Sequence, residues 1–200
     1  MGHPQPKSPP LVTLADFCAL TWPDDLRREL HDGQIVAMAP AKNAHGTLTA
    51  NLVFALKAAL RGRRPCRVQT EAGILPPTRE HSYYQADLLV TCEPSRPGER
   101  EVAAPLFVCE VLSESTELFD WRCKVPEYRA IASVREVLLV DSERMFVELH
   151  RRLDERRWLT EILQRPHDEL VLETAGVKLA LVDLYEDVAL PAAGNLELPL

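Results

Sequence analysis

The sequence has no long hydrophobic run, and this absence limits the kinds of protein it can encode. A transmembrane helix needs about 20 consecutive apolar residues, and every apolar run here is far shorter. Residues 1–10 are polar and rich in proline, without the hydrophobic core of a signal peptide. We therefore expect a cytoplasmic protein with no membrane partner.

Cysteine is scarce, and its spacing fits no common cysteine motif. The five cysteines are an odd number and lack CxxC or zinc-ligand spacing. Cys92 and Cys109 lie in predicted buried strands, where cysteine behaves as a small hydrophobic residue. We expect reduced structural thiols in a reducing compartment, and no disulfide bonds.

Positive charge is in deficit. Lys and Arg number 23 against 30 Asp and Glu, which gives a formal net charge of −7. This balance argues against broad, non-specific binding of nucleic acid. Two local basic clusters are either binding faces or solvated turns. They comprise Lys57, Arg61, Arg63, Arg64 and Arg67 after a predicted helix, and Arg151, Arg152, Arg156 and Arg157 near a predicted hairpin.

What is present is a regular alternation of apolar patterns. Helical spacing predicts helices over residues 13–22, 43–60 and 116–132. Alternating or continuous short apolar runs predict a hairpin over 29–40 and strands over 66–75, 85–92, 106–112, 136–141, 145–150, 157–163 and 170–182. This order indicates a mixed β-sheet flanked by helices, in the α/β or α+β class. We expect a disordered tail at 1–10, a single domain over 11–190, and a C-terminal tail at 191–200.

Two of the predicted buried strands each carry one acid. Asp87 opens the apolar run 88–90, and Glu110 closes the run 106–109. The polar segment 93–101 is a loop, so the two strands can be neighbours with their acids close together. An acid inside an apolar strand costs several kcal/mol unless a cation or hydrogen bonds compensate it. Both acids either bind a divalent cation or are solvated at the sheet's edge.

Such a pair of acids suits one chemistry in particular. Oxygen ligands bind Mg²⁺, which keeps several waters. One of these waters, deprotonated near the metal, can attack a phosphodiester. A lysine near the second acid can orient that water or stabilise charge on the phosphate.

Several short segments of the chain form a recognisable series that covers roughly residues 12–145. They are Glu29-Leu-His-Asp-Gly-Gln-Ile-Val-Ala-Met-Ala-Pro, Ala44-His-Gly, Ala86-Asp87, Glu110-Val-Leu-Ser-Glu-Ser-Thr, Asp120, Lys124, Tyr128-Arg-Ala and Val134-Arg-Glu-Val-Leu-Leu-Val-Asp141. Together, and in this order, these segments resemble the Uma-two family, within the PD-(D/E)xK superfamily of restriction-endonuclease-like nucleases.

The resemblance implies the roles of four residues. Asp87 and Glu110 would be the catalytic, metal-binding acids, and the carbonyl of Val111 would add a ligand. The lysine of the superfamily pattern Glu-x-Lys is replaced here by Leu112. The resemblance implies that Lys124, from the following helix, supplies the catalytic lysine instead.

Three further residues are implied as accessory to the site. Glu71 matches an acid on the preceding strand, and His45 matches the family's histidine at the start of a helix. Asp120 lies one helical turn before Lys124 and can pair with it. For Lys124, the alternative is an exposed helix lysine paired with Asp120.

These residues predict a DNA endonuclease that depends on Mg²⁺ or Mn²⁺. The resemblance implies a homodimer, because two sites can cut two strands. A catalytically inactive protein of the same fold, acting as a binding or assembly module, is the main alternative. A nuclease acting on RNA or on a structured junction is a third, because metal ligands report the phosphodiester chemistry and not the sugar.

Overall fold

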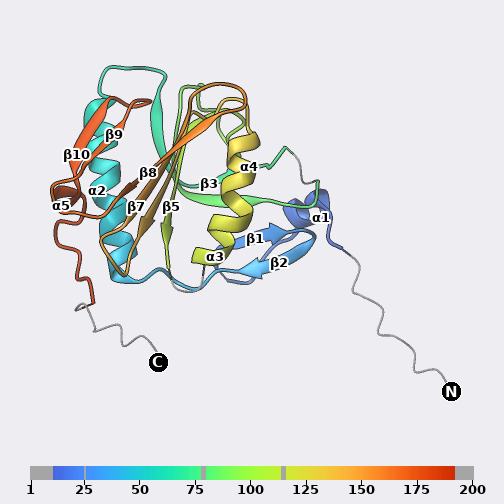
Figure 1. Ribbon diagram of the computed structural model, residues 1–200. Helices are drawn as coiled ribbons and strands as arrows, with labels where there is room; N and C mark the ends of the chain where they lie inside the picture. Colours follow the sequence, from blue (N-terminus) through green and yellow to red (C-terminus); the bar gives the residue numbers. More distant parts are fainter. Residues whose placement is uncertain (1–10, 25, 78–79, 114–115, 192–200) are drawn as a thin grey trace.

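A six-stranded mixed sheet forms the centre of the computed structural model, which describes residues 11–24, 26–77, 80–113 and 116–191 (Figure 1). Its strands lie side by side in chain order: β3 (Arg67–Ile74), β4 (Tyr84–Thr91), β5 (Pro105–Leu112), β6 (Glu136–Asp141), β7 (Val147–Arg152) and β8 (Trp158–Leu163). Strands β5 and β6 are parallel, and the other neighbouring pairs are antiparallel. The predicted mixed sheet is therefore confirmed.

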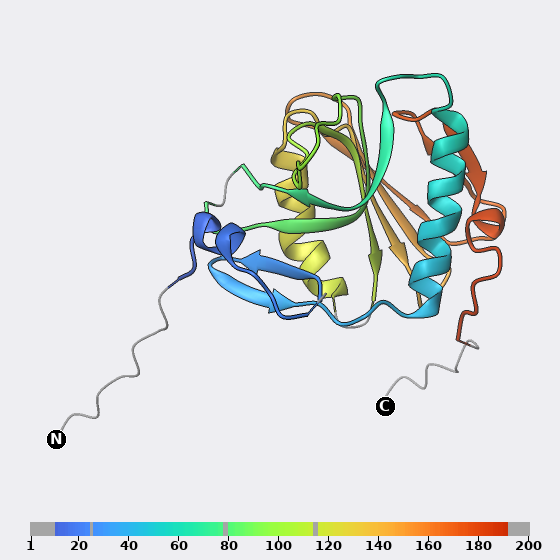
Figure 2. The same ribbon diagram turned by 180° about the vertical axis from the view of Figure 1, so that it is seen from behind.

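Helices cover both faces of this sheet (Figures 1 and 2). On one face lies α2 (Asn43–Ala59), with Leu48, Leu52 and Leu56 fully buried against the sheet. The small hairpin of β9 (Glu169–Leu172) and β10 (Val177–Ala180), together with α5 (Leu181–Leu184), extends the same layer. The segment between β5 and β6 packs on the opposite face and supplies the crossover that parallel strands require.

That crossover segment is helical throughout, as predicted, but it is not a regular α-helix. It consists of α3 (Glu117–Phe119), a π-helical turn η1 (Asp120–Lys124) and α4 (Val125–Ala130). The amide of Val125 donates to the carbonyl of Asp120, five residues back. Pro126 has no amide to donate and sits at the start of α4. The irregularity near Pro126 takes the form of a widened turn just before it.

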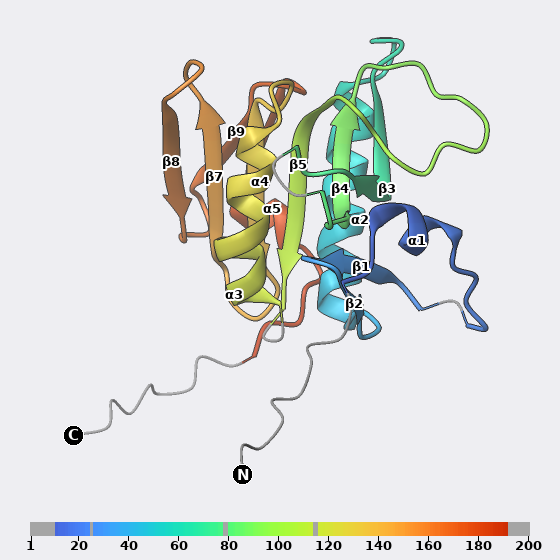
Figure 3. The ribbon, with the colours of Figure 1, turned by 90° about the vertical axis from the view of Figure 1, so that its right-hand side faces the viewer.

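A smaller layer beside β4 is built from the N-terminal part of the chain (Figure 3). It contains α1 (Leu14–Ala19), capped by the Thr13 hydroxyl, and the hairpin of β1 (Arg28–His31) and β2 (Gln34–Ala37). Asp32 and Gly33 both have positive φ, as the predicted two-residue turn requires. Leu30 and Tyr83 exchange backbone hydrogen bonds of 2.8 and 2.9 Å, which fasten the hairpin to the start of β4.

The cysteines differ from the prediction at one pair. Cys66 and Cys92 form a disulfide bond, so the expectation of no disulfides was wrong. Arg67 pairs with Thr91 across the antiparallel strands. Cys66 precedes Arg67 and Cys92 follows Thr91, so the two cysteines lie opposite each other. Sequence spacing alone does not reveal this pairing. Cys109 is buried in β5, as predicted.

Two other expectations concern the ends of the chain and membranes. The expected tails at residues 1–10 and 191–200 lie outside the described residues, apart from Pro191. Within the part of the chain that the structure describes, no helix has the length and apolar character needed to cross a bilayer.

Candidate active site

Asp87 and Glu110 lie next to each other on adjacent strands. The β4–β5 register pairs Leu88 with Cys109, so the acids occupy the next opposing positions. The amide of Asp87 lies 3.4 Å from Glu110 Oε2, and the amide of Val111 donates to Asp87 Oδ2 at 2.8 Å. Both acids are buried, with exposed fractions of 6% and 1%. They are therefore not solvated edge residues.

Asp87 is held by two cationic or polar side chains. Arg27 Nη1 donates to Asp87 Oδ1 at 2.6 Å, and His45 Nε2 lies 3.1 Å from Oδ2. Burial alone would raise the pKa of Asp87. The hydrogen bond from His45 and the charge of Arg27 hold that pKa well below its usual range. Asp87 is therefore ionised at neutral pH.

Lys124 is buried at the centre of three carboxylates. Its Nζ lies 3.0 Å from Glu29 Oε1, 3.1 Å from Asp120 Oδ1 and 3.4 Å from Glu110 Oε1. Only 1% of the residue is exposed, so it is not the solvated helix lysine of the alternative hypothesis. Burial would lower the pKa of Lys124, but the three carboxylates raise it above its ordinary value.

Glu110 is the carboxylate most inclined to keep a proton. Burial raises its pKa well above the ordinary value, and the nearby Lys124 does not offset this, because Asp87 and Asp120 also repel negative charge. Tyr128 donates its hydroxyl to Glu110 Oε1 at 2.5 Å. Glu110 is thus the group that responds most readily when positive charge enters the site.

Glu29 completes the cluster from the N-terminal hairpin. It is fully buried and accepts hydrogen bonds from the amide of Gln85 at 2.8 Å and from Lys124, while His31 Nε2 lies 2.7 Å from Oε2. Burial opposes its ionisation, yet Lys124 and these hydrogen bonds lower the pKa of Glu29 to about 2. Its ionised side chain anchors Lys124.

All seven residues singled out from the sequence line one cavity of about 560 Å³. They are His45, Glu71, Asp87, Glu110, Val111, Asp120 and Lys124. They come from α2, three strands and the π-helical turn, so the fold gathers residues from most of the chain at one point.

Glu71 reaches the cavity because β3 is irregular at that residue. Thr70 pairs with Leu88 and Ala72 with Ala86, so the register continues unchanged across Glu71, whose backbone has a φ of +50°. Its side chain is exposed and lines the cavity wall. This local change of backbone conformation places an edge-strand acid at the cavity of the buried pair.

The donor set is suited to a hard divalent cation. Asp87 and Glu110 supply carboxylate oxygens, the ligands that Mg²⁺ and Mn²⁺ favour. The amide of Val111 donates to Asp87 Oδ2, so this end of β5 lies directly against the acid.

Charge balance supports the same conclusion. Four buried acids (Glu29, Asp87, Glu110 and Asp120) face two permanent cations (Arg27 and Lys124), which leaves two negative charges when all are ionised. Within the described ranges, no group of three or more His, Cys, Asp or Glu side chains forms a ready metal site. Waters or substrate oxygens would have to complete the coordination of any ion bound here.

Three residues of the cluster were not singled out from the sequence: Arg27, Glu29 and Tyr128. Glu29 opens the matching hairpin segment, and a carboxyl next to buried Leu30 was a usable signal. Tyr128 falls in another matching segment. Arg27 has no sequence signal, because its partner Asp87 lies 60 positions away.

A mixed sheet whose adjacent strands bury two acids beside a lysine is an arrangement found in restriction-endonuclease-like proteins. The family model "Uma2: Putative restriction endonuclease" matches residues 14–182, and the chain belongs to this family.

Individual relatives match most of the chain. The uncharacterized protein slr1290 of Synechocystis sp. is 28% identical over 186 residues, covering 91% of this chain and 96% of the relative. The uncharacterized protein sll1609 of the same organism is 29% identical over 157 residues, covering 76% and 88%. Among solved structures, a "putative nuclease belonging to DUF820" from Anabaena variabilis has a TM-score of 0.70 at 16% identity, covering 88% of this chain and 98% of that one. At this identity the structure shows a shared fold.

Proposed function

We propose that the protein is a metal-dependent endonuclease that hydrolyses phosphodiester bonds in DNA. The observation that carries this proposal is the meeting of Asp87, Glu110 and Lys124 at one cavity. The family to which the chain belongs supports the same class of reaction.

Each residue of the site has its own role in this proposal. Asp87 and Glu110, with the carbonyl of Val111, would hold Mg²⁺ or Mn²⁺. When bound, such an ion supplies a water of lowered pKa and neutralises charge on the phosphate. Lys124 is fixed by Glu29 and Asp120, so its ammonium is positioned to orient the attacking water or to stabilise the phosphate's negative charge.

Arg27 is proposed to bind the substrate once a metal ion occupies the site. It occupies Asp87 Oδ1, and its side chain is 21% exposed at the cavity wall. A cation at Asp87 would compete with the guanidinium for that oxygen. Arg27 would then be free to pair with a phosphate oxygen of the substrate.

A catalytically inactive binding or assembly module of the same fold is the second candidate. This candidate is favoured because side chains of the protein already compensate the charge of the acids without a metal ion. Arg27 pairs with Asp87, and Lys124 contacts three carboxylates. Part of the basic clusters is also already engaged. Arg151 and Arg152 bind carboxylates or backbone carbonyls, as do Arg63, Arg67 and Arg157.

The deciding experiment is nicking of a supercoiled plasmid with Mn²⁺, with a parallel measurement of Mn²⁺ binding by calorimetry. We expect Asp87→Ala to abolish both cleavage and metal binding. Lys124→Met should lower cleavage by about 100-fold or more while Mn²⁺ still binds. The control Lys178→Ala removes an exposed lysine of β10 and should cleave like the wild type.

Two results would overturn the nuclease proposal. One is a folded wild type that binds no Mn²⁺ and cleaves no DNA form, which supports the inactive module. The other is cleavage that persists in Asp87→Ala, which assigns the activity to a contaminant. A parallel assay on RNA and on branched DNA decides whether the substrate is the duplex or one of the alternatives.

The proposed enzyme is a homodimer in the cytoplasm. Two copies would place one site on each strand of a duplex. Light scattering on the purified protein tests this directly, since a mass near 45 kDa would be twice the 22.5 kDa of one chain.

A further inference from the structure

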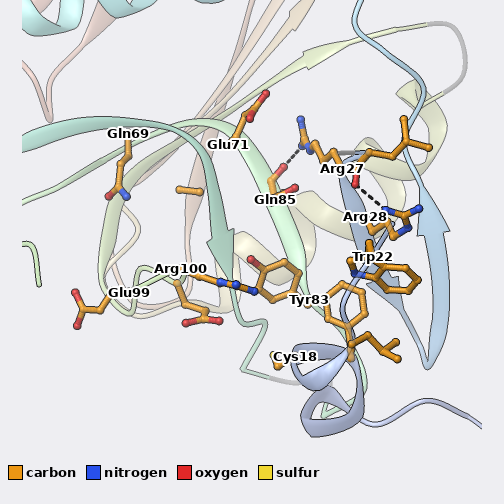
Figure 4. Close-up of a pocket in the computed structure, with 15 residues that line it drawn as sticks. Cys18, Trp22, Arg27, Arg28, Gln69, Glu71, Tyr83, Gln85, Glu99 and Arg100 are labelled. Atoms are coloured by element: carbon orange, nitrogen blue, oxygen red, sulfur yellow. Dashed lines mark hydrogen bonds between the residues drawn. The ribbon is translucent and has the colours of Figure 1, made fainter. Parts of the chain in front are cut away.

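A second cavity adjoins the carboxylate cavity and shares part of its wall. It has a volume of about 640 Å³ and lies between α1, the segment leading into β1, and the strands β3 and β4 (Figure 4). Leu26, Arg27 and Glu71 line both cavities. A molecule bound at Asp87 could therefore continue into this second space, which the proposed chemistry does not use.

The charges around the second cavity cancel. Three arginines face three glutamates among its described lining residues, namely Arg27, Arg28 and Arg100 against Glu71, Glu99 and Glu101. A phosphate or another strongly charged group is therefore not favoured over a neutral one.

Polar groups without partners are concentrated here. Within the described residues, six enclosed side-chain atoms lack a hydrogen-bond partner, and three of them belong to Arg27, Gln69 and Gln85, which line this cavity. Each such atom costs about 1–3 kcal/mol when buried. The unpartnered atoms of Gln69 and Gln85 are their enclosed Oε1 oxygens, so a ligand would offset this cost once the two amide groups turn toward the cavity.

Aromatic rings supply the opposite wall. Trp22 is 38% exposed. The guanidinium carbon of Arg28 lies 4.2 Å from the centroid of the Trp22 ring. Tyr83 packs on Phe17 with ring centroids 5.3 Å apart. Figure 4 shows Trp22 and Tyr83 on the side of the pocket away from Gln69.

The position of Tyr83 depends on a glycine across the strand pair. A Cβ at Gly73 would collide with the Tyr83 hydroxyl and would lie 2.8 Å from the carbonyl oxygen of Arg100. Gly73 therefore leaves room for the tyrosine hydroxyl between β3 and the loop before β5. The cavity is shaped by this close approach.

We propose that the second cavity binds one unstacked nucleobase of the substrate strand, next to the phosphate at Asp87 and Glu110. A base is neutral, planar and edged with hydrogen-bond donors and acceptors, which matches the balanced charge, the rings and the amides. Trp22 provides a face for stacking, and Gln69 and Gln85 read the base edge. The inference rests on the proposed nuclease function for the identity of the strand.

The test is a binding measurement without metal, so that no cleavage occurs. Short labelled single strands of DNA and of RNA are titrated by fluorescence anisotropy in EDTA, with an abasic site placed at each position in turn. We expect one position at which loss of the base weakens binding about tenfold. In Gln69→Leu and in Trp22→Ala, the abasic and intact strands should bind alike.

The matched control is Gln164→Leu, an exposed glutamine in the turn after β8, which should keep the abasic effect. Trp22 is exposed and its removal leaves the core intact, so Trp22→Ala decides the matter if Gln69→Leu fails to fold. The proposal is overturned if no abasic position matters, or if both cavity variants behave like Gln164→Leu.

The base-binding proposal and the nuclease proposal can be refuted independently of each other. An abasic effect that persists in Asp87→Ala, together with loss of cleavage, supports both. If loss of a base weakens binding but the protein never cleaves, the base-binding proposal is supported and the nuclease proposal is refuted. Cleavage that depends on Asp87 without any abasic effect keeps the nuclease and refutes the base site.

Discussion

Glu29 and Lys124 are 95 positions apart in the sequence, and their side chains meet at 3.0 Å in the interior. Removing one partner leaves a buried charge without compensation. We expect Glu29→Gln to lower the free energy of unfolding by about 3 kcal/mol, measured by urea denaturation at pH 7. The comparison is Glu143→Gln, whose carboxylate pairs with Lys42 at 2.8 Å on the surface and should matter by less than about 1 kcal/mol. Equal effects of the two substitutions would contradict a structural role for the buried pair.

The stabilisation by Glu29 should depend on pH in one direction. Its pKa is about 2 in the folded protein, against 4.5 ordinarily, so its contribution is fully present above pH 4.5 and is lost as the pH falls toward 2. The difference in unfolding free energy between wild type and Glu29→Gln should therefore shrink over that interval. A difference that stays constant down to pH 2 would refute the lowered pKa.

Metal binding should release a proton from Glu110. Burial raises the pKa of Glu110, so a cation that needs its carboxylate must displace the proton. We expect Mn²⁺ affinity to rise with pH, and calorimetry in two buffers of different ionisation enthalpy to show proton release. Asp87 releases none, because its pKa is already held low. In Glu110→Gln the proton release should vanish, and its persistence there would assign it to another group.

The long helix α2 offers a paired test of the core. Leu52 is fully buried against the sheet, whereas Phe54, two residues later, is 78% exposed. Leu52→Ala should cost about 3 kcal/mol of unfolding free energy, and Phe54→Ala less than about 0.5 kcal/mol. Thermal and urea denaturation both report the difference. A large effect at Phe54 would indicate that the outer face of α2 is covered in solution.

The parts of the fold that follow local patterns could be predicted from the sequence. The apolar runs beside Asp87 and Glu110 correctly predicted two neighbouring strands. The leucine spacing predicted α2 with the correct first residue and a last residue one position too far. Matching segments identified Lys124 despite Leu112 at the usual lysine position. These features depend on hydrophobic period or on a recognisable series of residues.

The remaining features depend on tertiary register, which spacing does not encode. The Arg27–Asp87 ion pair and the disulfide of Cys66 with Cys92 both join segments whose relative position is set by strand pairing. The positive φ at Glu71 interrupts an alternation that looks regular in the sequence. Val68 and Ala72, on either side of it, lie in the cores on opposite faces of the sheet, although a regular strand would put them on one face.

The π-helical turn before Pro126 has a consequence for comparing this chain with its relatives. A π-helical turn holds one residue more than an α-helical turn, so a relative with one residue fewer between Glu117 and Lys124 and a regular α-helix there would still turn its lysine toward Glu29 and Glu110. An alignment without a gap at this turn would miss that lysine. Spacing along this segment, as much as residue identity, therefore matters when the same arrangement of side chains is sought in a homologue.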